Sequence, residues 1–211
     1  DEVLEYLEAN RPDVVGISAV VSTAYEYSKK FSIDIKRMYP DCLMVLGGNM
    51  GASANVLLRK TGVDLVVLGE GEAIFLDVVR RFEETKNLNN FKDITGLAYI
   101  DDRGALVNTG YREQIPKEEM YDLDWDDLEK NTDINTYFPA ASDPNSPTAH
   151  FDHDSRYKEP KRSGKNIGYL YLSKGCVSKC TFCHRWDKGI RFIPVDVCMQ
   201  RLDEIIERYN V

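Results

Sequence analysis

Short apolar runs alternate with helical patterns over residues 1–90 of the chain. Residues 14–21 form an apolar run without polar alternation, which is typical of a strand covered on both faces. Two shorter runs, at 43–46 and 65–68, are followed by glycine, where a chain can turn sharply. Apolar residues at helical spacing predict helices at about 2–9, 24–39, 52–60 and 73–84. This alternation predicts an α/β fold with a doubly wound parallel sheet of the flavodoxin-like or Rossmann-like type.

The pattern changes after residue 86. Residues 94–100 and 105–108 flank Asp101-Asp102-Arg103-Gly104, which predicts a β-hairpin. Residues 121–165 are acidic and then rich in Pro, Asp, Ser and Asn, which indicates an irregular linker. A strand-like run at 167–173 and a helical pattern at 195–209 follow. We therefore predict an α/β domain at 1–90, a hairpin and linker at 91–165, and the first strand–helix unit of a second domain at 166–211.

The overall charge narrows the range of functions. The net charge of −8 and the isoelectric point near 5.0 disfavour a nucleic-acid-binding role, because phosphate groups attract a basic face. No apolar run approaches the length of a membrane span, and no basic-then-apolar leader is present. We expect a cytoplasmic protein without a membrane span.

Three of the five cysteines fall within eight residues, which points to a metal site rather than to disulfide bonds. Cys176, Cys180 and Cys183 have the spacing C-x3-C-x2-C. The other two, Cys42 and Cys198, stand among apolar neighbours and are interpreted as small buried residues.

Three thiolates on one loop can hold three corners of a four-iron cluster, because soft sulfur ligands suit iron. The fourth iron is then open to an exogenous ligand, which favours a redox enzyme. Two other interpretations remain. His184 could complete a structural zinc site, although zinc sites usually combine two separated pairs of ligands. The run Cys180-Thr-Phe-Cys183-His184 also matches a haem attachment pattern, which leaves Cys176 unexplained.

The segment from Leu172 to Cys183 resembles the cluster loop of radical S-adenosylmethionine enzymes, including Gly175 before the first cysteine. Arg191-Phe-Ile-Pro194 and the helix after it resemble that family's first helix. The resemblance implies that a [4Fe-4S] cluster binds and reductively cleaves S-adenosylmethionine, giving a 5′-deoxyadenosyl radical. It also implies a reductant such as flavodoxin or ferredoxin and a small-molecule substrate. Phe182 would then lie near the adenine, or simply pack the loop.

The front half resembles the cobalamin-binding domain that precedes many radical S-adenosylmethionine enzymes. Four stretches carry the resemblance: Pro12 to Ser18, Ser22, Val45 to Gly48, and Gly62 to Glu72. The serines would border the pocket for the nucleotide tail of cobalamin, and the glycines would let that tail pass close to the backbone. The cofactor-binding residues implied are Ser18, Ser22, Gly47, Gly48, Gly69 and Glu70.

The serines and Glu70 also have a simpler interpretation. The two serines could satisfy backbone groups at a strand end, and Glu70 and Glu72 suit the first turn of a helix through its dipole. Gly47-Gly48 does not match G-x-G-x-x-G, so a dinucleotide site is disfavoured. His150 and His153 lie in a polar stretch and are interpreted as solvated rather than as cobalt ligands.

The sequence as a whole is interpreted as a fragment of a cobalamin-dependent radical S-adenosylmethionine enzyme, in which the first strand of the cobalamin domain is missing. Such enzymes transfer methyl groups to unactivated carbon or phosphorus, and some form rings. One alternative keeps the radical chemistry and leaves the front domain empty, as a docking or gating module. A second alternative, an electron-carrier or sensor module, is disfavoured because a fourth cysteine is lacking near the cluster motif.

Overall fold

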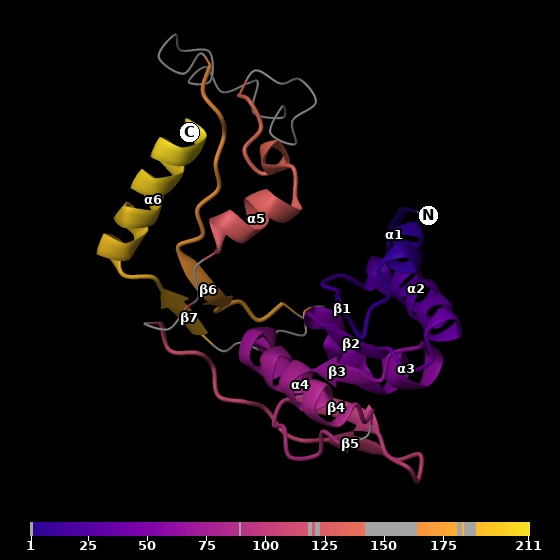
Figure 1. Ribbon diagram of the computed structural model, residues 1–211. Coiled ribbons are helices and arrows are strands. Elements are labelled where there is room, and N and C mark those ends of the chain that lie inside the picture. Colours follow the sequence, from indigo (N-terminus) through magenta and orange to yellow (C-terminus); the bar gives the residue numbers. More distant parts are fainter. Residues whose placement is uncertain are drawn as a thin grey trace. The chain divides into compact units, whose positions relative to one another are not determined.

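The computed structural model describes residues 2–88, 90–117, 120, 123–141, 164–180, 183 and 189–211 (Figure 1). The chain divides into two compact units, Asp1–Gln114 with Cys176–Gly189, and Ile115–Gly175 with Ile190–Val211. The helices are α1 (Glu2–Ala9), η1 (Ser22–Ala24), α2 (Tyr25–Met38), η2 (Asn49–Ser53), α3 (Ala54–Lys60), α4 (Gly71–Thr85), α5 (Trp125–Asn131), η4 (Ile134–Thr136) and α6 (Val195–Tyr209). The strands are β1 (Val14–Ser18), β2 (Leu43–Gly47), β3 (Leu65–Val67), β4 (Leu97–Ile100), β5 (Leu106–Asn108), β6 (Ser173–Cys176) and β7 (Gly189–Phe192).

The first unit is built on a five-stranded sheet with the strand order β1-β2-β3-β4-β5. Strands β1, β2 and β3 are parallel, as the alternation of strands and helices predicts. The predicted hairpin is also present, but β4 pairs antiparallel with β3, so the hairpin extends the same sheet. Leu97 and Ala98 of β4 are buried, because this strand covers the edge that β3 would otherwise expose. The α/β class is confirmed, and the sheet is mixed rather than wholly parallel.

Helices cover both faces of this sheet (Figure 1). On one face, Ile74, Val78 and Phe82 of α4 pack against side chains of β2 and β3. On the other face, α3 packs against β2 and β3, and α1 and α2 pack against β1 and β2. The side chains of β2 are buried from Leu43 to Leu46, which explains why its sequence is apolar without alternation. The sheet is therefore the core of the unit.

The apolar run at 14–21 pairs only as far as Ser18. Val20 and Val21 are each 58% exposed, because the chain leaves the sheet there and turns into η1. The strand-like run at 167–173 is a second difference, since only Ser173 belongs to the strand β6. Ile167 instead donates its N–H to the carbonyl of Pro139, so these residues pack as an irregular segment.

The second unit is held by an aromatic cluster. The rings of Phe138 and Tyr209 stack with centroids 4.0 Å apart, and Trp125 lies edge-on to Tyr209. The phenol of Tyr209 donates to Glu129 at 2.7 Å, and burial raises the pKa of this phenol to about 12. Part of the stretch predicted to be a linker is therefore packed on the predicted helix α6. None of the helices within the described ranges combines the length and apolar character that crossing a bilayer requires.

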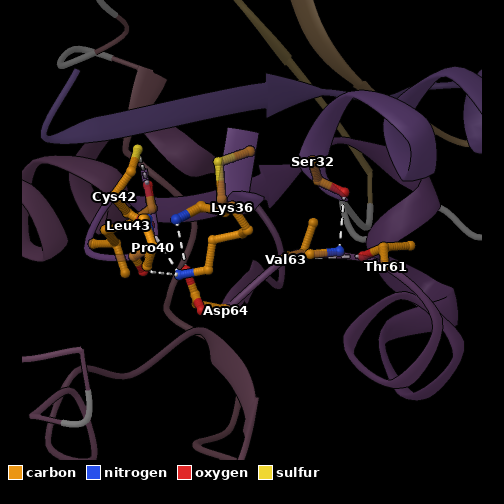
Figure 2. A network of polar contacts seen from close by, with 10 residues as sticks. Ser32, Lys36, Pro40, Cys42, Leu43, Thr61, Val63 and Asp64 are labelled. Atoms are coloured by element: carbon orange, nitrogen blue, oxygen red, sulfur yellow. Dashed lines mark hydrogen bonds and ion pairs between the residues drawn. The ribbon is translucent and has the colours of Figure 1, made fainter. Parts of the chain in front are cut away.

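A polar network ties α2 to the amino ends of β2 and β3 (Figure 2). Asp64 accepts from the ammonium group of Lys36 at 3.0 Å and from the N–H of Met44 at 2.8 Å. The same ammonium donates to the carbonyl oxygens of Pro40 and Cys42. Burial raises the pKa of the Asp64 carboxyl, while the bonds from Met44 and Lys36 oppose this shift.

Replacing Asp64 with alanine removes two bonds at once and leaves the N–H of Met44 without its acceptor. We expect Asp64→Ala to lower the free energy of unfolding by about 2 kcal/mol. Asp34→Ala is the control, because Asp34 forms a surface ion pair with Arg37, and its loss is expected to cost about 0.5 kcal/mol or less. Urea denaturation of both variants measures this, and equal losses would contradict the structural role of Asp64.

Candidate functional site

The predicted cofactor residues of the front domain lie at the carboxyl ends of β1, β2 and β3. Ser18 and Gly47, the last residues of β1 and β2, are paired across the two strands. Gly69 and Glu70 follow the end of β3, and Ser22 opens η1 after β1. Ligands of open α/β sheets bind beyond this edge. The structure thus brings the predicted residues to one edge of one sheet.

Gly48 is required by the backbone itself. Its φ of 86° lies in the left-handed region, and a Cβ atom there would approach the carbonyl oxygen of Ala19 to 2.5 Å. The same carbonyl of Ala19 accepts from the N–H of Met50, and Gly51 donates to the carbonyl of Gly48. A glycine is needed here to let two backbone segments meet, whether or not a ligand is present.

Gly47 and Gly69 differ from Gly48 in what surrounds them. A Cβ atom on Gly47 would meet only the side chain of Val67, at an ordinary contact distance of 3.8 Å. A Cβ atom on Gly69 would meet nothing within 4 Å, although its φ of 110° disfavours other residues. The space beside Gly69 is therefore open, and Gly47 is the glycine that could be replaced without strain.

Helix α4 begins at this edge, after Glu70, without a side-chain hydrogen bond from its N-cap residue. The starts of α2 and α3 differ, because the N–H groups of Tyr25 and Ala54 donate to the carbonyls of Ser22 and Gly51 in the preceding turns. The first backbone N–H groups of a helix have no partner within the helix, and its dipole favours an anion there. Such helix ends suit a phosphate group.

These features fit cobalamin on three counts. Small residues line the strand ends, the hydroxyl-bearing residues Ser18 and Ser22 are exposed, and the N-terminus of α4 could face the phosphate of a nucleotide tail. Ser18 and Gly47 could border the tail, and Gly69 leaves room beside the end of β3. The residues present thus agree with the group that the resemblance implies.

The cysteine motif belongs to the segment between β6 and β7, which pair in a two-stranded sheet. Cys176 is the last residue of β6, and Cys176, Cys180 and Cys183 are all exposed. The N–H of Ser178 donates to the Cys176 sulfur at 3.4 Å, and that of Cys183 to the carbonyl of Cys180 at 3.2 Å. Within the described ranges, no three or more His, Cys, Asp or Glu side chains are grouped so as to hold a metal ion.

The donor set of the motif nevertheless suits iron, because three thiols are accessible within eight residues of chain. Phe182 and His184, as well as His150 and His153, lie outside the described residues. Cys42 is 2% exposed and burial raises the pKa of its thiol to about 11, as expected for an inert interior residue. Cys198 is partly buried, and its thiol faces the carbonyl of Ile193 at 3.7 Å.

An open groove of 620 Å³ lies along α4, and no motif in the sequence predicts it. Two ion pairs cross it, Arg81 to Asp93 at 2.7 Å and Arg112 to Asp77 at 2.6 Å. The Arg81 guanidinium lowers the pKa of Asp93 to about 2. These pairs fasten the chain on either side of the hairpin to α4, so we assign the groove a structural role.

Comparison with known families defines the class of the first unit. Residues 1–79 match the family model of the B12 binding domain, and this range includes β1, β2 and β3. This match agrees with the cobalamin-binding-type domain that the sequence of the front half predicts.

Two curated relatives extend the similarity over the whole chain. The anaerobic magnesium-protoporphyrin IX monomethyl ester cyclase of Rubrivivax gelatinosus is 26% identical over 215 residues, which cover 100% of this chain and 34% of that protein. The cytidylyl-2-hydroxyethylphosphonate methyltransferase of Streptomyces wedmorensis is 24% identical over 222 residues, covering 100% of this chain and 40% of that protein. The chain therefore spans well under half the length of these relatives.

A solved structure matches as well. The cobalamin-dependent S-adenosylmethionine radical enzyme OxsB, with aqua-cobalamin and S-adenosylmethionine bound, aligns with a TM-score of 0.59 and 17% identity. The alignment covers 98% of this chain and 25% of that chain. At this identity the likeness concerns the fold, and it confirms the α/β architecture predicted from the sequence.

The two neighbouring glycines provide a prediction about the site's architecture. Gly48→Ala combines a positive φ with a contact to the Ala19 carbonyl, so we expect it to lower the free energy of unfolding by about 2–4 kcal/mol. Gly47→Ala, which meets only an ordinary contact, is expected to change it by about 1 kcal/mol or less. Denaturant unfolding of the two variants measures the difference, and equal effects would contradict the assignment.

Proposed function

We propose that this chain is part of a cobalamin-dependent radical S-adenosylmethionine enzyme that methylates or cyclises a small-molecule substrate. The observation that carries the proposal is one chain that joins a B12-binding-type domain to the motif Cys176, Cys180 and Cys183. The names of the two relatives, a cyclase and a methyltransferase, support methylation and cyclisation as the two proposed reactions.

In this proposal the carboxyl edge of the sheet holds cobalamin, which when bound supplies a cobalt centre able to carry a methyl group. The exposed Ser18 and Ser22 would donate hydrogen bonds to the nucleotide tail, and the start of α4 would face its phosphate. Gly47 would allow the tail to lie against the strand ends. Glu70 would help to place the loop after β3 rather than touch the reacting atoms.

Cys176, Cys180 and Cys183 would hold three irons of a [4Fe-4S] cluster, which when bound supplies an electron to S-adenosylmethionine. Their thiols must lose protons on binding, so cluster affinity should fall in acid. The N–H of Ser178, which already points to the Cys176 sulfur, would stabilise that thiolate. Phe182 would contribute an apolar surface beside the adenine.

Cobalamin retention tests the first half of the proposal. The purified protein is incubated anaerobically with hydroxocobalamin and desalted, and its visible spectrum and cobalt content per chain are measured. We expect near-stoichiometric cobalt, and at least about tenfold less in Gly47→Val, because its added methyl groups occupy the space of the tail.

Ala105→Val is the matched control for cobalt retention. It makes a similar small-to-valine change in the exposed turn of the hairpin, far along the chain from the strand ends. It should retain cobalt as the unmodified protein does. Cobalt-free unmodified protein would instead support the alternative of an empty front domain.

Iron and sulfide analysis tests the second half of the proposal, the iron–sulfur cluster. After anaerobic reconstitution we expect close to four irons and four sulfides per chain, and loss of the visible cluster absorption in Cys176→Ala, Cys180→Ala and Cys183→Ala. Cys198→Ala is the control and should keep the cluster, since this partly buried thiol stands outside the motif. Bound zinc without sulfide in the unmodified protein would contradict the assignment.

A further inference from the structure

An asparagine stands at the end of β2, in the middle of the parallel part of the sheet. Asn49 follows the glycine pair and opens η2, and β2 lies between β1 and β3. This residue is exposed, as are Ser18 and Ser22 at the end of the neighbouring strand. The stretches by which the cobalamin-binding domain was predicted stop at Gly48 and resume at Gly62, so the sequence assigns Asn49 no role.

The backbone on both sides of Asn49 is held by the residue that follows β1. Ala19 donates its N–H to the carbonyl of Gly47 at 2.9 Å and accepts from the N–H of Met50 at 3.0 Å. Gly48 lies so close to the carbonyl of Ala19 that no Cβ atom fits there. The place of Asn49 at the edge is therefore fixed before a ligand binds. A polar group on a fixed backbone loses little conformational freedom when it binds a ligand.

The side-chain amide of Asn49 has no hydrogen-bond partner among the residues that the structure describes. Asparagine is common in turns because its side chain can bond to the backbone nearby. Other asparagines of this chain do form bonds within the protein through their side chains, and they include Asn10, Asn55, Asn108, Asn131 and Asn166. The amide of Asn49 is thus not used to build its own turn, and its two N–H donors are available at the edge.

We propose that Asn49 is a specificity-determining residue for cobalamin, whose side-chain amide donates a hydrogen bond to the phosphate group of the nucleotide tail. The inference rests on the proposed function, in which this tail lies against Gly47 at the same strand end. A phosphate oxygen accepts hydrogen bonds and cannot donate them, so it matches an amide N–H and not the carboxylate of Glu70. Asn49 would act in binding alone.

A donor at the end of β2 complements the start of α4, which follows β3. The first turn of α4 would offer backbone N–H groups to the phosphate, and Asn49 would offer a side-chain N–H from the adjacent strand end. Two other parts of cobalamin could also meet an amide, namely the carboxamides of the corrin ring and the hydroxyl of the ribose. The phosphate differs from both because it carries a negative charge, and this difference can be tested.

Two corrinoids and two variants test the proposal. The purified protein is titrated anaerobically with hydroxocobalamin and with cobinamide, which lacks the nucleotide tail and its phosphate, and calorimetry gives the dissociation constants. We expect Asn49→Ala to raise the dissociation constant of hydroxocobalamin about tenfold, because a hydrogen bond to a charged acceptor is lost. Asn49→Asp should raise it about thirtyfold or more, because its carboxylate also repels the phosphate. Both variants should bind cobinamide within about twofold of the unmodified protein.

Asn10→Asp is the matched control for the added charge. It makes the same amide-to-carboxylate change at an exposed position before the amino end of β1, at the opposite edge of the sheet. It should bind both corrinoids as the unmodified protein does. Urea denaturation should give the same midpoint for Asn49→Ala and the unmodified protein, since the amide of Asn49 bonds to none of the described residues.

The possible results assign failure to one proposal or the other. Unmodified protein that binds neither corrinoid would overturn the proposed function and, with it, the role of Asn49. Cobalamin binding that Asn49→Ala leaves unchanged would overturn the role of Asn49 alone. Equal losses for cobalamin and cobinamide would place the contact on the corrin ring, and a loss in Asn49→Ala that is absent in Asn49→Asp would place it on the ribose hydroxyl. Either of these results would overturn the phosphate contact.

Discussion

The close approach of two backbone segments, at Gly48 and Ala19, is the constraint on which the candidate cobalamin site depends. There the end of β2 meets the chain leaving β1, at a distance that admits no Cβ atom. This contact holds Ser18 beside Gly47 and, through the bond from Met50 to Ala19, sets the start of η2 and the course of the chain into α3. The edge is thus shaped by backbone geometry before any ligand arrives.

The amino and carboxyl ends of the parallel strands differ in the contacts that they make. At the amino ends, Asp64 and Lys36 form a dense polar network that fixes α2 against β2 and β3. At the carboxyl ends, small residues lie beside the start of α4, whose N-cap residue Glu70 makes no side-chain hydrogen bond to the first turn. A side-chain cap at that position would stabilise the helix. A ligand that accepted hydrogen bonds from the first N–H groups of α4 would take the place of such a cap.

The local elements of the first unit could be predicted because each has its own apolar pattern, and α1 and α4 agree with the expected ranges within two residues. The antiparallel pairing of β4 with β3 could not be predicted from the sequence, since strand partners are set by tertiary packing. The helix α5 was missed because its stability comes from Trp125 packing on Tyr209. A signal was nevertheless present, since Asp124 caps this helix through the N–H of Asp127.

The sequence also identified the glycines and cysteines as candidate site residues, but it did not show which of them the backbone itself requires. A pattern of residue types contains no φ angle, so Gly47 and Gly48 looked equivalent although only Gly48 has the left-handed conformation. The cysteine motif was located by the spacing of its residues alone. Among its described residues, the N–H of Ser178 donates to the Cys176 sulfur and that of Cys183 to the Cys180 carbonyl, and the three thiols are exposed. A metal centre bound by these thiols would join three positions of the chain, so its binding would be coupled to local folding. The candidate cobalamin edge differs, because packing of the backbone at Gly48 and Ala19 already shapes it.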